Sequence, residues 1–351
     1  MNHRERILAA MRHQPVDRIP TDIWATDEVW QKLRAHFGVR DNLDVYEKLD
    51  IDGIMGISPR YIGPVCPTVA GIRYDEWGMG YRAQGYGSGS YDEQVIFPLE
   101  RAQSLAELEA FPWPSPDWYD YSVLPAQAAR YAGRSVQVGY TAIFYWHNRL
   151  RGLEQSLVDP LEQPEMTRFL VQKLSDFFTE YHRRCFEATR GLVDSTQVTD
   201  DFGSQHGLLI SPRVFDQFYR AGMQRAIDLA HEYGLVVFHH DDRDLRKLLP
   251  RLVEMGVDLL NPIQWRCGDW DLAKLKAEYG QKLCFHSAVD NQQTLPFGTP
   301  ADVRAEVRHL LRTLGSDHTG FIIAPCHNLQ TVSPIENILA LYETANEGFV
   351  D

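Results

Sequence analysis

The sequence predicts an α/β protein that folds as a single (β/α)8 TIM barrel over residues 1–351. Eight short apolar segments are separated, most regularly in the second half, by amphipathic segments of helical length. Strands that alternate with helices pair in parallel and carry the helices outside, and eight such units close into a barrel. No strand is followed by a glycine-rich phosphate turn, which disfavours the alternative, a doubly wound open sheet.

The boundaries of the elements follow from the apolar runs and from capping residues. The predicted strands are 19–25, 51–58, 135–145, 193–201, 235–241, 257–264, 282–290 and 320–326. The predicted helices cover 3–13, 27–37, 162–188, 243–255 and 270–279, and three more begin at Ser211-Pro212, Thr299-Pro300 and Ser333-Pro334-Ile335-Glu336. Serine or threonine before proline is typical of a helix start, and glycine is typical of a helix end. Glycines stand at four of the predicted ends, Gly38, Gly234, Gly256 and Gly280.

Residues 60–100 differ from the rest because they are rich in glycine, tyrosine and proline. This composition predicts β-hairpins and loops, inserted after the second strand. An excursion of this length between regular elements usually has a function. We expect it to form a lid over the site, a surface for a partner protein, or the contact of a homodimer.

Composition and charge exclude several classes of partner. The chain is 44% hydrophobic and carries a formal net charge of -13, which argues against nucleic acid or an anionic membrane as the main partner. Its five cysteines are scattered without a CxxC pair, which favours a reducing, cytoplasmic setting over a disulfide framework. The N-terminal stretch has no long apolar run, so we expect neither a signal peptide nor a membrane-spanning helix.

The stretch 235–242, LVVFHHDD, is the strongest indication of chemistry. Side chains two apart on a strand point the same way, so His240 and Asp242 share one face, and His239 and Asp241 share the other. An imidazole and a carboxylate at the end of a barrel strand form either a metal-ligand pair or an acid/base pair. An ordinary strand end followed by a solvated acidic turn is the simpler alternative.

Polar residues also follow the other predicted strands, and the ends of barrel strands build the active site. We predict catalytic roles for Asp200, Asp201 and His286. We predict substrate-binding roles for Trp24, Tyr140, His206, Gln264, Asp290 and His327. Three chemistries remain open: a metal site, metal-free proton transfer by Asp200 or Asp201 beside His240, and nucleophilic catalysis by Cys326. The last ranks lowest, because adjacent residues on a strand diverge and nothing marks an oxyanion hole.

Several motifs along the chain resemble the uroporphyrinogen decarboxylase superfamily. They are ERILAAMRHQPVDRIP near the start, LRGLEQSLVD at 150–159, DDFGSQHGLLISPRVFDQFY at 200–219, VDNQQTLPFGTPADVRAEV at 289–307 and PIENILALYE at 334–343. The resemblance runs from end to end and implies a TIM barrel. This superfamily holds decarboxylases that need no cofactor. It also holds zinc-dependent methyltransferases, which pass methyl groups between corrinoid proteins and a thiol such as coenzyme M.

The resemblance points more to the methyltransferases than to the decarboxylases. Decarboxylases carry an RQAGR loop that holds substrate carboxylates, whereas residues 21–30 here read TDIWATDEVW, without arginine. Methyltransferases bind zinc through an HxC motif and a distal cysteine. His240 and Cys326 match the histidine and the distal cysteine, whereas Asp242 puts a carboxylate in place of the motif cysteine. The neighbouring His239, Asp241 and His327 would substitute if the register slips by one. The resemblance therefore implies a metal-dependent, methyltransferase-like enzyme that acts on a small methylated substrate or a corrinoid carrier on a partner protein. The alternatives are a metal-free decarboxylase and a non-catalytic partner of a corrinoid protein.

Overall fold

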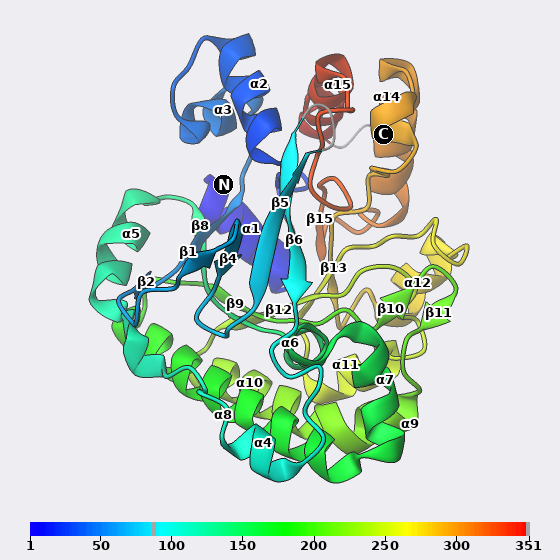
Figure 1. The fold of residues 1–351 in the computed structure, drawn as a ribbon. Helices are drawn as coiled ribbons and strands as arrows, with labels where there is room; N and C mark the ends of the chain where they lie inside the picture. Colours follow the sequence, from blue (N-terminus) through cyan, green and yellow to red (C-terminus); the bar gives the residue numbers. More distant parts are fainter. Residues whose placement is uncertain (86–88, 349–351) are drawn as a thin grey trace.

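The centre of the fold is a parallel sheet of seven strands, seen in a computed structural model that describes residues 1–85 and 89–348 (Figure 1). The strands follow one another around the sheet in chain order: β1 (Ile54–Ile57), β8 (Ser135–Thr141), β9 (Ser195–Val198), β12 (Val236–His240), β13 (Leu259–Asn261), β14 (Cys284–His286) and β15 (Phe321–Ile322). Neighbours in sequence are neighbours in space, as the alternation of strands and helices predicts. The α/β class and the barrel-like arrangement are confirmed.

The predicted strand 19–25 lies between the two edge strands but does not form a continuous ladder. Thr21 bridges to Ile323 beyond β15, and the Gly53 N–H, just before β1, donates to the Thr21 carbonyl at 2.9 Å. The Thr21 N–H instead donates to the buried Asp52 carboxylate at 3.0 Å. This side-chain acceptor replaces a strand partner, so the segment is joined to the β15 edge by isolated bridges and to the β1 edge by the Gly53–Thr21 hydrogen bond.

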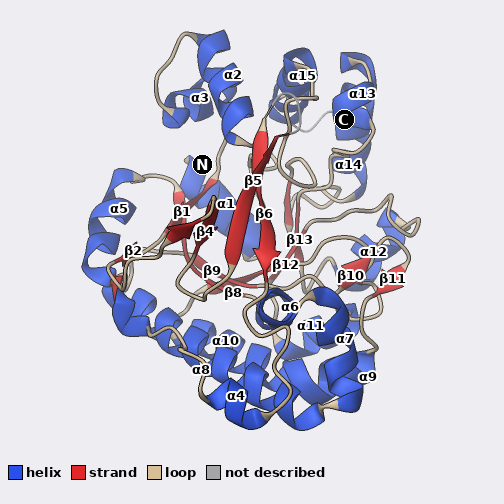
Figure 2. Cartoon of the chain, in the orientation of Figure 1, coloured by secondary structure: helices blue, strands red, loops and turns tan. Residues whose placement is uncertain are grey.

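Helices surround the sheet (Figure 2). The longer ones are α1 (His3–Met11), α2 (Asp27–Phe37), α3 (Asn42–Leu49), α5 (Leu124–Arg130), α6 (Ile143–Arg151), α7 (Leu153–Glu162), α8 (Pro164–Ala188), α10 (Arg220–Glu232), α11 (Leu249–Met255), α12 (Leu272–Tyr279), α14 (Pro300–Thr313) and α15 (Ile335–Asn346). Short helical turns are α4 (Leu105–Glu109), α9 (Pro212–Val214) and α13 (Thr294–Phe297), and a π-helical turn, Phe215–Tyr219, leads into α10. Within the described residues, none of the helices has the length and apolar character needed to span a bilayer.

The excursion after β1 forms hairpins, as its composition predicts. Four strands make an antiparallel sheet: β3 (Thr68–Val69), β4 (Ile72–Tyr74), β5 (Gly80–Gly85) and β6 (Ser90–Ile96). Figure 1 shows the β5–β6 hairpin crossing in front of the central sheet. Arg149 on α6 holds its base, because one guanidinium nitrogen donates to the Tyr81 hydroxyl at 2.7 Å while the Arg149 carbonyl accepts from Gln94. Two further antiparallel pairs complete the fold: β2 (Arg60–Tyr61) with β7 (Tyr119–Asp120), and β10 (Gly203–Ser204) with β11 (Gly207–Leu208).

Several element boundaries differ from the prediction; the helix expected over 243–255, for example, is α11 and begins only at Leu249. The strand expected over 135–145 ends at Thr141, and α6 begins at Ile143, because a buried carboxylate accepts from the N–H groups of its first turn. The helix expected over 162–188 begins at Pro164, directly after α7 has ended at Glu162. Proline is favoured in a first helical turn, where its missing N–H costs nothing.

A buried histidine on α8 makes the fold sensitive to acid. His182 is fully buried, with its Nε2 atom 3.1 Å from the Thr141 hydroxyl, and burial lowers its pKa to about 4. The unfolded chain takes up this proton near pH 6.5, so stability is lost as the pH falls from 6.5 towards 4. One such group contributes a slope of at most about 1.4 kcal/mol per pH unit.

We therefore expect the urea concentration at the unfolding midpoint to decrease as the pH is lowered from 7 to 4. In the His182→Gln variant this decrease should be smaller, because unfolding takes up one proton fewer. Urea titrations of both proteins at half-unit pH steps measure this difference. Equal slopes in the two proteins would show that His182 does not stay neutral in the fold. His231, which is partly exposed and paired with Asp258 at 2.9 Å, provides a control histidine, since its pKa is raised instead.

Candidate functional site

Three side chains with metal-binding atoms meet at the carboxyl ends of β12 and β15. One donor atom from each of His240, Asp242 and His327 lies within 4.8 Å of the other two. His240 Nε2 is 3.7 Å from Asp242 Oδ1, and His327 Nε2 is 3.7 Å from Asp242 Oδ2. Zinc ligands about 2 Å from a common ion stand roughly 3.4 Å apart in tetrahedral geometry, so small side-chain rotations would bring these atoms onto one ion.

The Asp242 carboxylate supplies an observation that an ordinary acidic turn does not explain. Its Oδ1 atom is buried and has no hydrogen-bond partner among the described residues. A buried carboxylate oxygen without a partner is costly. Asp201 adds a further carboxylate, with Oδ1 4.0 Å from His240 Nε2. Burial raises the pKa of Asp201, and the charge of nearby Asp242 raises it further. The arrangement fits a cation at Asp242.

A chain of hydrogen bonds beneath the cluster fixes the orientation of His240. Its Nδ1 atom is 2.6 Å from Asn261 Oδ1, and Asn261 Nδ2 is 2.7 Å from His286 Nδ1. His286 Nε2 is in turn 3.0 Å from the Asp22 carboxylate. The carboxylate only accepts, so each donor in the chain is determined, and His240 Nδ1 carries the proton. The Nε2 lone pair of His240 therefore faces the cluster, as a metal ligand requires.

His286, a predicted catalytic residue, lies one layer below the mouth and is buried. The Trp24 indole, predicted to bind substrate, covers this layer: its ring centre lies 5.5 Å from that of His240, 6.1 Å from that of His286 and 6.3 Å from that of His327. Trp24 thus forms an apolar wall of the mouth, whereas His286 positions other groups.

Asp241 and Asp200, which neighbour residues of the mouth in the sequence, accept hydrogen bonds from backbone N–H groups of nearby segments. The fully buried Asp241 carboxylate accepts from the N–H groups of Phe202 and Gly203. A Cβ atom at Gly203 would stand 2.1 Å from the Asp242 carbonyl, so only glycine allows the two loops to approach this closely. Asp200, predicted to be catalytic, accepts from the Phe144 and Tyr145 N–H groups at the start of α6, and burial raises its pKa well above the ordinary value.

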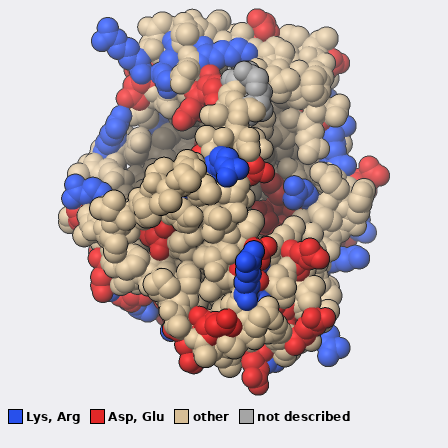
Figure 3. All heavy atoms as spheres, in the orientation of Figure 1, with Lys and Arg blue, Asp and Glu red and all other residues tan. Residues whose placement is uncertain are grey.

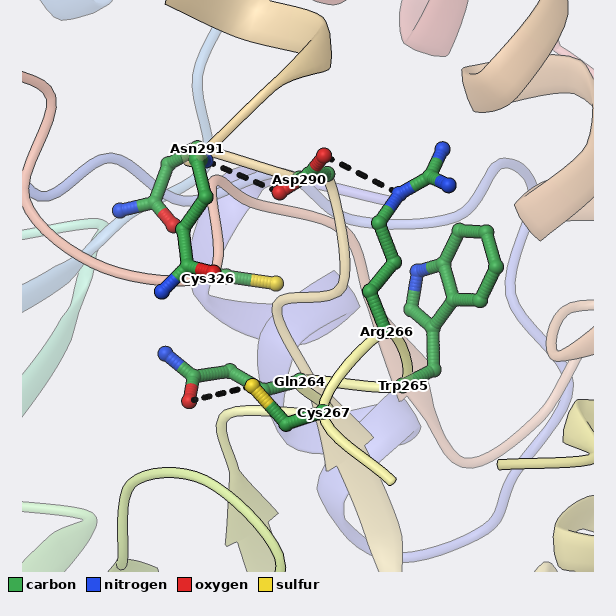
Figure 4. Close-up of a pocket in the computed structure, with 8 residues that line it drawn as sticks. Gln264, Trp265, Arg266, Cys267, Asp290, Asn291 and Cys326 are labelled. Carbon is green, nitrogen blue, oxygen red and sulfur yellow. Dashed lines mark hydrogen bonds and ion pairs between the residues drawn. The ribbon is translucent and has the colours of Figure 1, made fainter. Parts of the chain in front are cut away.

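Cys326 does not join His240 and Asp242. Figure 4 shows its side chain in a small separate pocket that Cys267 also lines. The thiol is buried and donates to the Ile263 carbonyl at 3.5 Å, and burial raises its pKa well above the ordinary value. Adjacent residues near a strand end diverge, and here His327 points to the mouth while Cys326 points away. Among the described residues, the side chain that completes the group of donor atoms around His240 and Asp242 is thus that of His327, predicted to bind substrate, and not that of Cys326.

The four other predicted substrate-binding residues do not belong to the cluster of donor atoms. Gln264 and Asp290 line the pocket of Cys326, where Gln264 accepts from the Arg243 N–H and Asp290 pairs with Arg266 at 3.0 Å (Figure 4). His206 lies in the exposed turn between β10 and β11. Tyr140, at the end of β8, is 40% exposed as a residue; desolvation of its hydroxyl raises its pKa most, and Tyr145, Asp200 and Asp201 raise it further.

Asn261 and Asp22 are the residues of the site to which sequence reasoning gave no role. Asp22 is the one charged residue within the apolar run 19–25, and Asn261 ends the apolar run of β13. Both signals are visible in the sequence, because a polar residue inside a buried strand needs a partner. The identity of that partner depends on contacts between strands far apart in the chain, which only the fold supplies.

Comparisons with solved structures bear on the fold alone. The methyltransferase from Methanosarcina mazei has a similar fold, with a TM-score of 0.71 and 17% identity over 99% of each chain. The E. coli 3-keto-D-glucoside 4-epimerase has a TM-score of 0.37 and 15% identity over 65% of this chain and 86% of that one. L-ribulose 3-epimerase has a TM-score of 0.39 and 14% identity over 72% and 90%.

A search among curated proteins gives no significant match. The family model described as uroporphyrinogen decarboxylase matches residues 140–348, which is more than half of the chain. The region includes β12, β15 and the whole His240/Asp242/His327 cluster. This chain belongs to the uroporphyrinogen decarboxylase family.

Proposed function

We propose that this chain is a metal-dependent enzyme of the methyltransferase type, which acts on a small methylated substrate or on a corrinoid methyl carrier held by a partner protein. The observation that supports it most is the buried, unpartnered Asp242 Oδ1 atom facing the His240 Nε2 lone pair. His240, Asp242 and His327 would hold the ion, with zinc as the first candidate. A bound ion of this kind supplies Lewis acidity and lowers the pKa of the group it activates.

The chain's own residues provide the rest of the mechanism. The Asn261–His286–Asp22 chain keeps the proton of His240 on Nδ1, so the imidazole does not have to lose one to bind the ion. Trp24 offers a flat apolar wall on which a methylated group can rest. Asp201, whose carboxylate lies 4.0 Å from His240 Nε2, is placed to exchange a proton with the reacting group.

The chemical character of the three ligands bears on which kind of substrate the ion would activate. Two imidazoles and a carboxylate form a harder set than one that contains thiolates, and the Cys326 thiol stays in its own pocket. Soft, negative ligands favour the activation of a thiol. The set in this chain therefore favours a substrate that offers an oxygen atom to the ion, such as a methoxy compound or water.

Metal analysis of protein purified without chelator tests the proposal. We expect stoichiometric metal in the purified chain, and methyl transfer from a methoxy compound to a corrinoid that stops in chelator and returns when the metal is restored. Protein that contains no metal and takes up none would overturn the proposal.

A metal-free lyase of the decarboxylase type is the second candidate, favoured by the raised pKa of Asp201, which suits an acid that protonates a carbanion. Incubation with uroporphyrinogen in the presence of chelator separates the two. Carboxyl loss that persists without metal would favour the lyase, and its absence leaves the metal-dependent reaction as the better account.

A further inference from the structure

A cleft lined with arginine opens beside the barrel mouth, between helices α2 and α3 on one side and α5 on the other. Its volume is about 570 Å³, within the usual range for small-molecule sites. The space-filling view is hollowed here, and Lys or Arg atoms stand at its rim (Figure 3). We call it the cationic cleft and define it by Arg34, Arg40, Arg130, Trp24, Trp30 and Asn328, which are among its lining residues.

The charge of the cleft opposes that of the whole chain. Three arginines line it against one carboxylate, Asp41, which gives a local charge of +2 in a chain whose formal charge is -13. Arg130 pairs with Asp41 at 2.9 Å, and Arg34 donates to the Asn42 side chain. Arg40 is exposed and has no hydrogen-bond or ion-pair partner in the part of the chain that the structure describes. The cleft therefore holds a free guanidinium group beside two that are already oriented.

The walls of the cleft are aromatic. The rings of Trp30 and Tyr46 are stacked, with centres 5.6 Å apart, and both line the cleft. Trp24 lines it too, and the same indole packs against His240 and His327. Asn328, the neighbour of His327, is a further lining residue. Trp24 and Asn328 thus lie at the boundary between the cationic cleft and the His240/Asp242/His327 cluster.

We propose that the cationic cleft binds a dianionic oxyanion of the phosphate type, carried by a ligand with a flat apolar body. Arginine pairs with such oxyanions through two parallel hydrogen bonds, and three guanidinium groups balance two negative charges as well as Asp41. The apolar body stacks on the aromatic walls and extends over Trp24 towards His327. Binding of the oxyanion needs only the cleft. That the other end of the ligand reacts beside the His240/Asp242/His327 cluster rests on the proposed function.

Binding of phenyl phosphate to the full chain, freed of metal by chelator, tests this proposal. Titration calorimetry is expected to show saturable binding that weakens roughly tenfold in Arg40→Gln, the loss typical of one charge-assisted hydrogen bond. Arg40 has no partner to lose, so this variant should fold normally. Arg312→Gln, which removes an exposed and equally unpaired arginine on α14, is the matched control and should bind like the wild type.

Two further titrations make the result decisive. Benzoate has the same ring and a single charge, and it should bind more weakly than phenyl phosphate. Asp242→Ala should leave the binding of phenyl phosphate unchanged, so a failure of the metal proposal would not remove this signal. The proposal is overturned if the wild type shows no saturable binding, if benzoate binds as tightly, or if Arg40→Gln and Arg312→Gln bind alike.

Discussion

Replacing Asp242 with alanine is expected to reduce the metal content of the purified protein to near zero and to abolish methyl transfer. Asp242 lies 3.7 Å from each of the two imidazoles, and it supplies the negative charge of the cluster. Loss of a residue that only hydrogen-bonds to a metal ligand already lowers metal affinity about 10- to 100-fold, and loss of a charged ligand itself must lower it further. Elemental analysis and a competition titration with a zinc-sensitive dye measure the loss.

The same substitution should not damage the fold. Alanine removes the unpartnered buried oxygen, so the free energy of unfolding of the metal-free protein should stay equal or rise. Asp228→Ala, at an exposed aspartate on α10, is the control and should keep its metal. Unchanged metal content in Asp242→Ala would show that the cluster is not the binding site. A loss of metal together with a loss of structure would show instead that Asp242 supports the fold.

Much of the barrel could be predicted because its strands leave a strong local pattern. Apolar runs such as 235–241 end abruptly in polar residues, and helix caps such as Ser211-Pro212 lie between them. The segment 19–25 shows the limit of this reasoning. Its composition is that of a strand, but the Asp52 side chain takes a hydrogen bond that a ladder would need. That contact joins residues 31 positions apart, so no local pattern contains it.

The site was predictable on one strand and not on the other. The alternation of side chains correctly separates His240 and Asp242 from His239 and Asp241, because β12 is regular up to His240. At residues 326 and 327 the chain has already left β15, so the choice between cysteine and histidine depends on the exact path of a loop. Asp200 and Asp201 differ in the same way, since one binds the start of α6 and its neighbour faces the mouth.

Replacing Asn261 with leucine is expected to lower the metal affinity about 10- to 100-fold although Asn261 contacts no metal. The leucine side chain cannot accept from His240 Nδ1 or donate to His286, so the His240 ring loses its fixed tautomer and orientation. The substitution leaves two buried ring nitrogens without partners, which costs about 1–3 kcal/mol of stability for each. Titration with Co²⁺, whose visible spectrum reports the geometry of its ligands, measures both the affinity and the distortion.

A control separates positioning from a general loss of stability. Gln197 on β9 donates to Gln137 at 2.8 Å, so Gln197→Leu removes an amide hydrogen bond of the same barrel outside the chain that ends at Asp22. It should lower the melting temperature without changing the Co²⁺ spectrum. Nitrogen chemical shifts of the metal-free protein should place the His240 proton on Nδ1 in the wild type and distribute it over both nitrogens in Asn261→Leu. An unchanged shift and affinity in Asn261→Leu would mean that packing by Trp24 alone orients the imidazole.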